Sequence, residues 1–290
     1  MPRPLIVAVP LVAALLALPA CGKKNKPTAS DMPPPAGGIA APGMPGTPGM
    51  PGMPGMPGNP NAGQPGDGSL PPRPQPPGLT SDVRTRQQSQ GNLKQIGLAL
   101  HFAADANRTI PVGIADRSGK VGLSWRVAIL PYLEQENLYR QFKLDEPWDS
   151  ENNKKLIRMM PKVFAAPGGD ANGYTYYRSF SGPDTAMPPP ARPAQPGQVV
   201  GGVGLFAIPD GTSNTLLVAE AAEPVIWTKP DELPFTRGQA PPKVGGGVFR
   251  DGFNVVLCDG STRFIKMTIS PTDLANAINR QDGMIVNLDN

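Results

Sequence analysis

Histidine and cysteine are scarce in this chain of 290 residues, which has one histidine and two cysteines. Zinc sites in proteins use three or four Cys, His or carboxylate ligands, so an inventory of His101, Cys21 and Cys258 argues against one. Basic runs with interleaved aromatic residues are also lacking, which argues against nucleic-acid binding despite a net charge of +4. We therefore expect no metal, no cofactor and no nucleic-acid partner.

Long hydrophobic runs are absent except at the N-terminus. Residues 5–18 form an apolar run, too short to span a bilayer comfortably, that follows Arg3 and precedes Ala20 and Cys21. These features are typical of a secretory signal, and the Ala-Cys pair resembles the bacterial lipobox, in which the cysteine thiol is acylated. An ordinary signal peptide followed by a chance cysteine is the alternative.

We predict that residues 1–20 are a lipoprotein signal peptide and that Cys21 becomes the acylated N-terminus. Several acyl chains on one cysteine hold a protein on a membrane durably, because each buried methylene contributes about 0.8 kcal/mol. The protein is thus expected to be exported and lipid-anchored, in the inner or the outer membrane of the bacterial cell envelope.

Proline and glycine, by contrast, are abundant and concentrated before the folded part. Of the 39 prolines, 17 lie within residues 27–77, and residues 43–60 read as six Gly-x-Pro triplets, the collagen period. Six triplets are few and the period ends at Asn61, so we predict that residues 21–79 are an extended, disordered stalk. A short trimerising triple helix is the alternative. At about 3.1 Å per residue, the Pro/Gly-rich part of about 50 residues, 27–77, reaches up to roughly 150 Å.

Residues 80–290 are expected to form a single domain with a substantial interior. Its best helical signal is the stretch 91–105, where apolar residues recur at spacings of three and four. This stripe, which we assign to the core, consists of Leu93, Ile96, Leu100 and Ala103. Residues 80–82 offer oxygens that cap backbone amides, so the helix is expected to begin there, with Gly91 costing about 1 kcal/mol relative to Ala.

Short helices are predicted in the first half of the domain. Residues 123–142 are apolar and aromatic on a helical period, and Pro131 is expected to divide them into two short helices. The stretches 109–113 and 119–122 resemble turns. Asp149 or Ser150 is expected to cap a helix over residues 152–160.

The second half of the domain is rich in β-forming residues. Strands are predicted over residues 174–180, 204–208 and 215–220, with exposed loops over residues 183–197 and 229–247. Residues 253–266 form the clearest unit, a hairpin in which Asp259 and Gly260 supply a two-residue turn. A helix over residues 272–279, with Leu274 and Ile278 inward, ends the domain. Helices followed by antiparallel strands indicate an α+β fold.

Two acidic positions are expected to have structural roles. Asp210 and Gly211 begin the sequence DGTSN, a turn whose side chains are expected to bond its own backbone. Glu220 ends an apolar strand, and a buried carboxylate needs a polar partner. We expect a structural ion pair with Arg126 or Arg263, in preference to a role as an acid catalyst.

The sequence gives weaker evidence for catalysis or ligand binding than for these structural roles. A Ser-His-Asp arrangement can be drawn from Ser213, His101 and Asp210, but no nucleophile elbow precedes the serine, so we predict that the protein is not an enzyme. Trp148 and Trp227 are candidates for stacking on sugar rings, with core packing as the alternative.

Six motifs resemble those of a known family. The motifs are NLKQIGLALH at 92–101, SWRVAILPYLEQ at 124–135, DEPWDS at 145–150, DGTSNTLLVAE at 210–220, WTKPDELP at 227–234 and DGSTRFIK at 259–266. Across about residues 83–287 the chain resembles paralogous planctomycete proteins with a domain of unknown function, DUF1559, usually found behind a prepilin-type segment. The resemblance implies a pilin-like long helix packed on an antiparallel sheet, and it implies no activity.

The chain departs from that family in two ways. Family members often carry a cysteine before the NLKQ motif and another in a Cys-Pro pair, where this chain has Ser89 and Ala166-Pro167. Once Cys21 is acylated, Cys258 has no partner for an intramolecular disulfide. The membrane-spanning pilin helix is replaced by lipobox and stalk, so assembly into a pilus through that helix is not expected.

The sequence thus predicts a non-enzymatic, lipid-anchored envelope protein that displays a pilin-like interaction domain on a flexible stalk. Its expected partners are the membrane, through Cys21, and an envelope protein or glycan. A glycan- or solute-binding module is the alternative, based on Trp148 and Trp227. A hydrolase would need a deep pocket that gathers His101 or Glu220.

Overall fold

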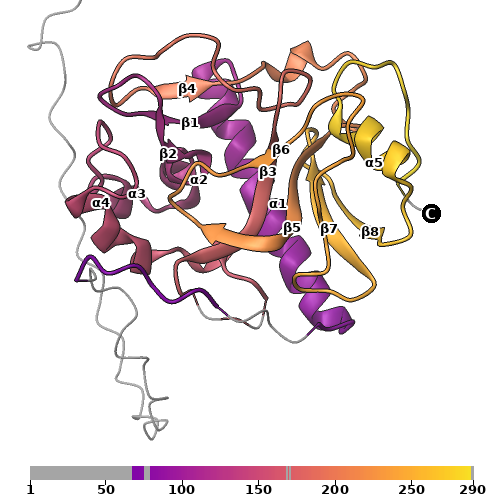
Figure 1. The fold of residues 1–290 in the computed structure, drawn as a ribbon, viewed down its shortest axis with the longest axis horizontal. Helices are drawn as coiled ribbons and strands as arrows, with labels where there is room; N and C mark the ends of the chain where they lie inside the picture. Colours follow the sequence, from indigo (N-terminus) through magenta and orange to yellow (C-terminus); the bar gives the residue numbers. More distant parts are fainter. Residues whose placement is uncertain (1–66, 75–78, 168, 170, 289–290) are drawn as a thin grey trace, which may run out of the picture. The chain divides into compact units, whose positions relative to one another are not determined.

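The computed structural model describes residues 67–74, 79–167, 169 and 171–288. The predicted signal peptide, Cys21 and the Gly-x-Pro triplets lie outside the described residues, so what the sequence indicates for them stays a prediction. The described part combines helices with two β-sheets, which confirms the α+β fold (Figure 1). Within it, no helix is both long and apolar enough to cross a membrane.

The longest helix, α1 (Val83–Asn107), confirms the strongest helical signal of the sequence. The Asp82 carboxylate caps its first turn by accepting a hydrogen bond from the Thr85 backbone N at 2.8 Å. Arg108 ends the helix in the left-handed conformation, with φ 64°. The predicted core stripe is buried, namely Leu93, Ile96, Leu100 and Ala103.

A five-stranded sheet with the order β6-β3-β5-β7-β8 forms the centre of the domain. Its strands are β3 (Tyr174–Ser181), β5 (Leu216–Ile226), β6 (Leu233–Pro234), β7 (Gly252–Leu257) and β8 (Thr262–Lys266). All neighbours are antiparallel except β3 and β6. The strands predicted over residues 174–180 and 215–220 are confirmed, and the second is longer than predicted.

The predicted hairpin is β7 and β8, but its turn is longer than two residues. The Leu257 backbone N donates to the Ser261 carbonyl at 2.9 Å, so Cys258 joins Asp259 and Gly260 in the loop. Gly260 has φ +77°, a conformation that glycine adopts without strain.

Strand β7 is buried on both faces because helices cover both. Val256 and Cys258 belong to the core cluster that contains the α1 stripe, whereas Phe253, Val255 and Leu257 pack with the residues of α5 (Pro271–Ile278). Figure 1 shows α1 crossing behind the strands of this sheet. The helix predicted over residues 272–279 is confirmed, with Leu274 and Ile278 buried.

A second sheet of three antiparallel strands corrects the sequence analysis. Its strands are β1 (Pro111–Ala115), β2 (Val121–Ser124) and β4 (Val199–Gly201), in the order β2-β1-β4. The sequence pattern gave turns at 109–113 and 119–122, because proline and glycine lower strand propensity there. Pairing overrides that propensity: a Cβ at Gly113 would clash with the Leu123 carbonyl oxygen of the paired strand.

The short helices also differ in detail from prediction. They are α2 (Trp125–Ala128), η1 (Leu130–Leu133), α3 (Glu136–Tyr139), α4 (Glu151–Leu156), η2 (Ile157–Met159), η3 (Lys162–Phe164) and η4 (Leu205–Ala207). Residues 123–142 thus form the end of β2 and three helical turns, since Pro131 starts a 3₁₀ turn. The strand predicted over 204–208 is wrong, because η4 occupies it. Ser150 caps α4 as predicted, its Oγ accepting from the Asn153 N at 3.2 Å.

The folded part includes residues that the sequence analysis assigned to the stalk. The Tyr174 hydroxyl donates to the Pro71 carbonyl at 3.2 Å, and Arg73 Nη2 lies 2.9 Å from Glu223 Oε2. The stretch 67–74 therefore packs beside β3 and β5.

Candidate functional site: a proline-lined groove

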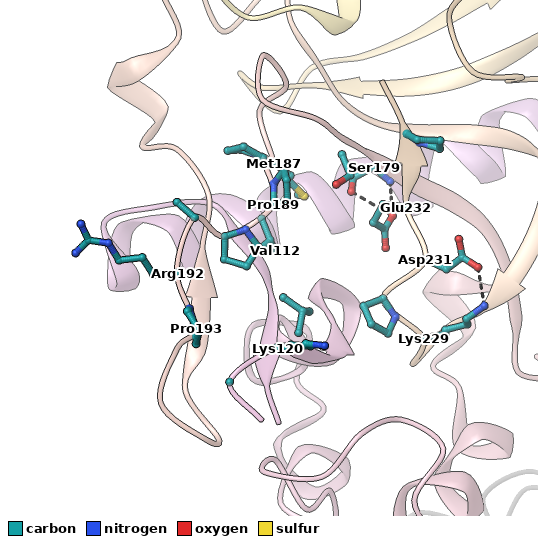
Figure 2. Close-up of a pocket in the computed structure, with 18 residues that line it drawn as sticks. Val112, Lys120, Ser179, Met187, Pro189, Arg192, Pro193, Lys229, Asp231 and Glu232 are labelled. Carbon is teal, nitrogen blue, oxygen red and sulfur yellow. Dashed lines mark hydrogen bonds and ion pairs between the residues drawn. The ribbon is translucent and has the colours of Figure 1, made fainter. Parts of the chain in front are cut away.

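A groove of about 790 Å³ lies where the two sheets approach each other. Val112 of β1, Val121 of β2, and Ser179 and Ser181 of β3 belong to its lining. Figure 2 shows the groove with Val112 and Ser179 labelled. Gly119 and Lys120, between β1 and β2, also line it. The rest of the lining comes from the loops predicted as exposed. They contribute Met187, Pro188, Pro189, Pro190, Ala191, Arg192, Pro193, Lys229, Pro230, Asp231, Glu232 and Pro234.

The carboxylate of Glu232 is fully engaged by the protein. It accepts hydrogen bonds from the Ser179 backbone N at 2.8 Å and the Ser179 Oγ at 3.1 Å. Arg126 Nη1 lies 2.9 Å from its Oε1, and the same guanidinium donates to the Tyr177 carbonyl. Burial lowers the pKa of Arg126, and the charge of Glu232 offsets part of that effect. Arg126 therefore neutralises Glu232 from beneath the groove.

Asp231 is engaged in a similar way. Its Oδ2 lies 2.8 Å from Lys229 Nζ, and its Oδ1 lies 2.9 Å from Arg178 Nη2. Burial raises the pKa of Asp231, but the hydrogen bond from Lys229 and the charges of Arg178 and Lys229 outweigh it, so the pKa lies below its usual value. Both acids of the groove are thus paired within the protein.

Lys120 differs from Lys229, Asp231 and Glu232, the paired charged groups of the groove. Among the described residues its Nζ has no hydrogen bond or ion pair, and its charge acts on Asp116, whose carboxylate is bonded by Ser118. In Figure 2 the Lys120 side chain lies between Val112 and Lys229, whereas the guanidinium of Arg192 extends away from the other labelled residues.

Trp227 is in the core, which contradicts its predicted role in stacking on sugars. Its ring has no exposed surface, its Nε1 donates to the Ile157 carbonyl at 2.9 Å, and it stacks on Phe164 with centroids 5.8 Å apart. Trp148 is half-buried and is not part of the groove lining; Lys229 Nζ lies 6.0 Å from its ring centroid. A ligand role for Trp148 stays a prediction.

Glu220 is buried, as its position suggested, but the predicted ion pair with Arg126 is wrong. Its carboxylate accepts hydrogen bonds from Ser89 Oγ and from the Asn254 backbone N at 2.6 Å, while Arg126 pairs with Glu232. Burial raises the pKa of Glu220 to about 7, and the hydrogen bonds from Asn254 and Ser89 oppose that rise. Sequence reasoning missed Ser89 as the partner because the two residues are far apart in the chain.

Asp210 makes hydrogen bonds beyond those of the predicted turn. Asn214 Nδ2 donates to the Asp210 carbonyl at 2.8 Å, and Gly211 has φ +91°, as a turn requires. The Asp210 carboxylate, however, accepts from the backbone N of Asp282 at 2.7 Å and of Gly283 at 2.8 Å. It fastens the C-terminal segment to the domain.

The remaining candidate residues pack structurally. A Cβ at Gly260 would lie 3.4 Å from His101 Nε2, and Lys94 Nζ donates to the Gly260 carbonyl at 2.9 Å, so α1 rests on the hairpin loop. Asp259 accepts from the Ser261 N at 2.8 Å within that loop. Burial raises the pKa of the Cys258 thiol, which keeps it protonated.

These observations define an α+β domain with a long helix against a mostly antiparallel sheet and a proline-lined groove beside a second sheet. A family described as "Protein of unknown function (DUF1559)" matches residues 84–248, more than half of the chain. The chain belongs to this family, and every residue that lines the groove lies within the matched stretch. No curated protein and no solved structure matches the chain.

Proposed function

We propose that the protein is a non-enzymatic, lipid-anchored envelope protein whose folded domain binds a partner in the groove. The observation that carries this proposal is the groove itself. Its volume of about 790 Å³ falls in the range of small-ligand pockets, about 300–1,000 Å³, and apolar side chains form most of its walls. A solute fits this lining better than a glycan, since no Trp, Tyr or Phe lines the groove to stack on sugar rings.

The lipid anchor and the stalk determine where the domain is located in the cell. Acylation of Cys21 holds the protein on the membrane, and the Pro/Gly stalk lifts the domain away from it. The groove is then presented to the space beyond the membrane surface. Sorting of the lipoprotein decides whether the anchor lies in the inner or the outer membrane.

The surroundings of Glu220 and His101 favour a binding protein over a hydrolase. Glu220 is 2% exposed and lies beneath α1, where solvent does not reach its carboxylate. Neither Glu220 nor His101 lines the groove. The two groups that a hydrolase would use are therefore outside the place where a substrate would bind.

Metabolic labelling with palmitate tests the anchor. Wild-type protein is expected to incorporate label, and Cys21→Ala to incorporate none. Cys258→Ala is the matched control, because Cys258 is buried and should leave labelling unchanged. Wild-type protein that incorporates no more label than Cys21→Ala would contradict the proposal.

Binding of N-phenyl-1-naphthylamine, an uncharged apolar fluorophore, tests the groove. Ser181→Trp places an indole in the groove and is expected to abolish the fluorescence gained by the wild-type protein. Thermal unfolding of the variant checks that the fold is kept. Equal fluorescence from wild type and from a folded Ser181→Trp variant would argue against the groove as the binding site.

A further inference from the structure

We infer that the groove binds a small amphipathic anion, with Lys120 contacting the anionic head and the proline-lined walls contacting the apolar body. The inference rests on the proposed function, because it names the chemical class of the ligand that the same groove would hold. Three observations support it: the charge balance of the lining, the nature of the walls, and the polar groups left without partners.

The charge balance favours an anion. Asp231 and Glu232 are the acids of the lining, and three cations are within ion-pair distance of them: Arg126, Arg178 and Lys229. A cationic ligand would have to displace one of these partners. Lys120 has no ion pair among the described residues, and the Asp116 carboxylate on which its charge acts does not line the groove, so the lining carries net positive charge. A partly enclosed, low-dielectric site strengthens attraction for an anion.

The walls favour an apolar body of modest size. Val112, Val121 and Met187 are aliphatic, and the loop from Pro188 to Pro190 adds three rings. Proline has a fixed φ, so this wall loses little conformational freedom when a ligand binds. A folded protein partner could place only a side chain or two in a space of about 790 Å³, whereas a small amphiphile would fill much of it.

Two polar groups of the lining have no hydrogen-bond partner among the described residues. Lys120 offers three N–H donors, and the Ser181 hydroxyl has no hydrogen bond within the described residues. Carboxylate and phosphate oxygens accept from both donor types. Hydrogen bonds between charged partners are roughly twice as strong as neutral ones, so Lys120 should dominate the affinity for the head.

The experiment compares two fluorophores that share an aromatic body and differ in charge. 1-Anilinonaphthalene-8-sulfonate is an anion, and N-phenyl-1-naphthylamine is its uncharged counterpart. Both are titrated into the full chain carrying Cys21→Ser, which lacks the acyl acceptor. All variants share the apolar N-terminal run, so probe bound to that run gives the same signal in each. Binding to the groove is the fluorescence of a protein minus that of the Ser181→Trp variant, in which the indole fills the groove.

Variants of Lys120 distinguish the effect of its charge on binding from the effect of the groove's shape. Lys120→Ala is expected to raise the Kd for the anionic probe about tenfold, Lys120→Glu to raise it further, and Lys120→Arg to restore it. The Kd for the uncharged probe should stay the same in all three. Lys155→Ala is the matched control, because Lys155 is an exposed cation of α4 that does not line the groove, so its removal should leave both constants unchanged. Octanoate and octyl phosphate should displace the anionic probe more strongly than octanol, and their order identifies the preferred head.

Two other outcomes have distinct meanings. If both probes bind in the groove and Lys120 variants do not change the Kd of the anionic probe, the inference of an anion is wrong and the binding groove stands. If neither probe distinguishes wild type from a folded Ser181→Trp variant, the binding groove itself is wrong, and the inference falls with it.

Discussion

The Glu220 side chain in β5 accepts a 2.6 Å hydrogen bond from the Asn254 backbone N in β7. The ladder between these strands pairs Ala219 with Val255, so the carboxylate takes the place of the next backbone acceptor. On its other side Ser89 of α1 donates to the same carboxylate. One buried acid therefore joins the long helix to the centre of the sheet.

This arrangement predicts that stability depends on pH through Glu220. Its pKa is about 7 in the folded protein and 4.5 as the ordinary value, so between these pH values the folded state holds a proton that the unfolded state has lost. Stability is then greatest below about pH 4.5 and falls as pH rises to 7, by about 3 kcal/mol. Above pH 7 the penalty is constant.

Urea unfolding of wild type and Glu220→Gln at pH 5 and pH 8 measures this effect. The amide mimics the protonated acid, so the variant should match wild type at pH 5 and exceed its stability at pH 8. The difference between the proteins isolates Glu220 from other titrating groups. Parallel pH profiles for the two would show that Glu220 does not titrate in this range.

Two glycines of α1 should respond oppositely to alanine. At Gly91 a Cβ would meet nothing within 4 Å, so Gly91→Ala should stabilise the protein by about 1 kcal/mol through helix propensity. At Gly97 a Cβ would lie 2.7 Å from Val256 Cγ2. Gly97→Ala should destabilise the protein by on the order of 1 kcal/mol, because overpacking outweighs the propensity gain. Urea midpoints with unchanged m-values provide the measurement; two shifts of the same sign would contradict the close packing at Gly97.

The sequence predicted α1 well because its evidence is local. Its core stripe repeats within a few residues, and Asp82 caps the helix from the adjacent position. The second sheet depends instead on pairing β1 with Val199–Gly201, far along the chain, and neither segment has a strong pattern of its own. Non-local pairing of this kind leaves little signal in a window of a few residues.

The groove was beyond sequence reasoning for a similar reason. Residues 183–197 form a loop as predicted, whereas residues 229–247 include strand β6 (Leu233–Pro234), which the prediction missed. A loop pattern does not say which strands the loop faces. The burial of Glu220 was predicted from its place in an apolar strand. Its partner was not, since Ser89 is 131 residues away and an arginine was the more usual partner for a buried acid.

Alanine substitution of Trp227 and Trp148 should lower stability by different amounts, because one ring is in the core and the other is partly exposed. Trp227→Ala should destabilise the protein by about 3–5 kcal/mol, since the indole is fully buried against Phe164 and Phe142. Trp148→Ala removes a half-buried ring and should cost about 1 kcal/mol. Thermal or urea unfolding measures both. Equal, small losses would show that Trp227 is not packed as described.

The ion pair of Arg126 and Glu232 should behave as a coupled unit. Arg126→Met leaves the Glu232 carboxylate with Ser179 as its partner and without its cation, so it should destabilise the protein by about 3–5 kcal/mol. Adding Glu232→Gln removes the uncompensated charge and should recover much of that loss. A double-mutant cycle from urea unfolding measures the coupling. Additive losses would mean that the two charges do not interact, and Glu232 would then contribute free negative charge to the groove.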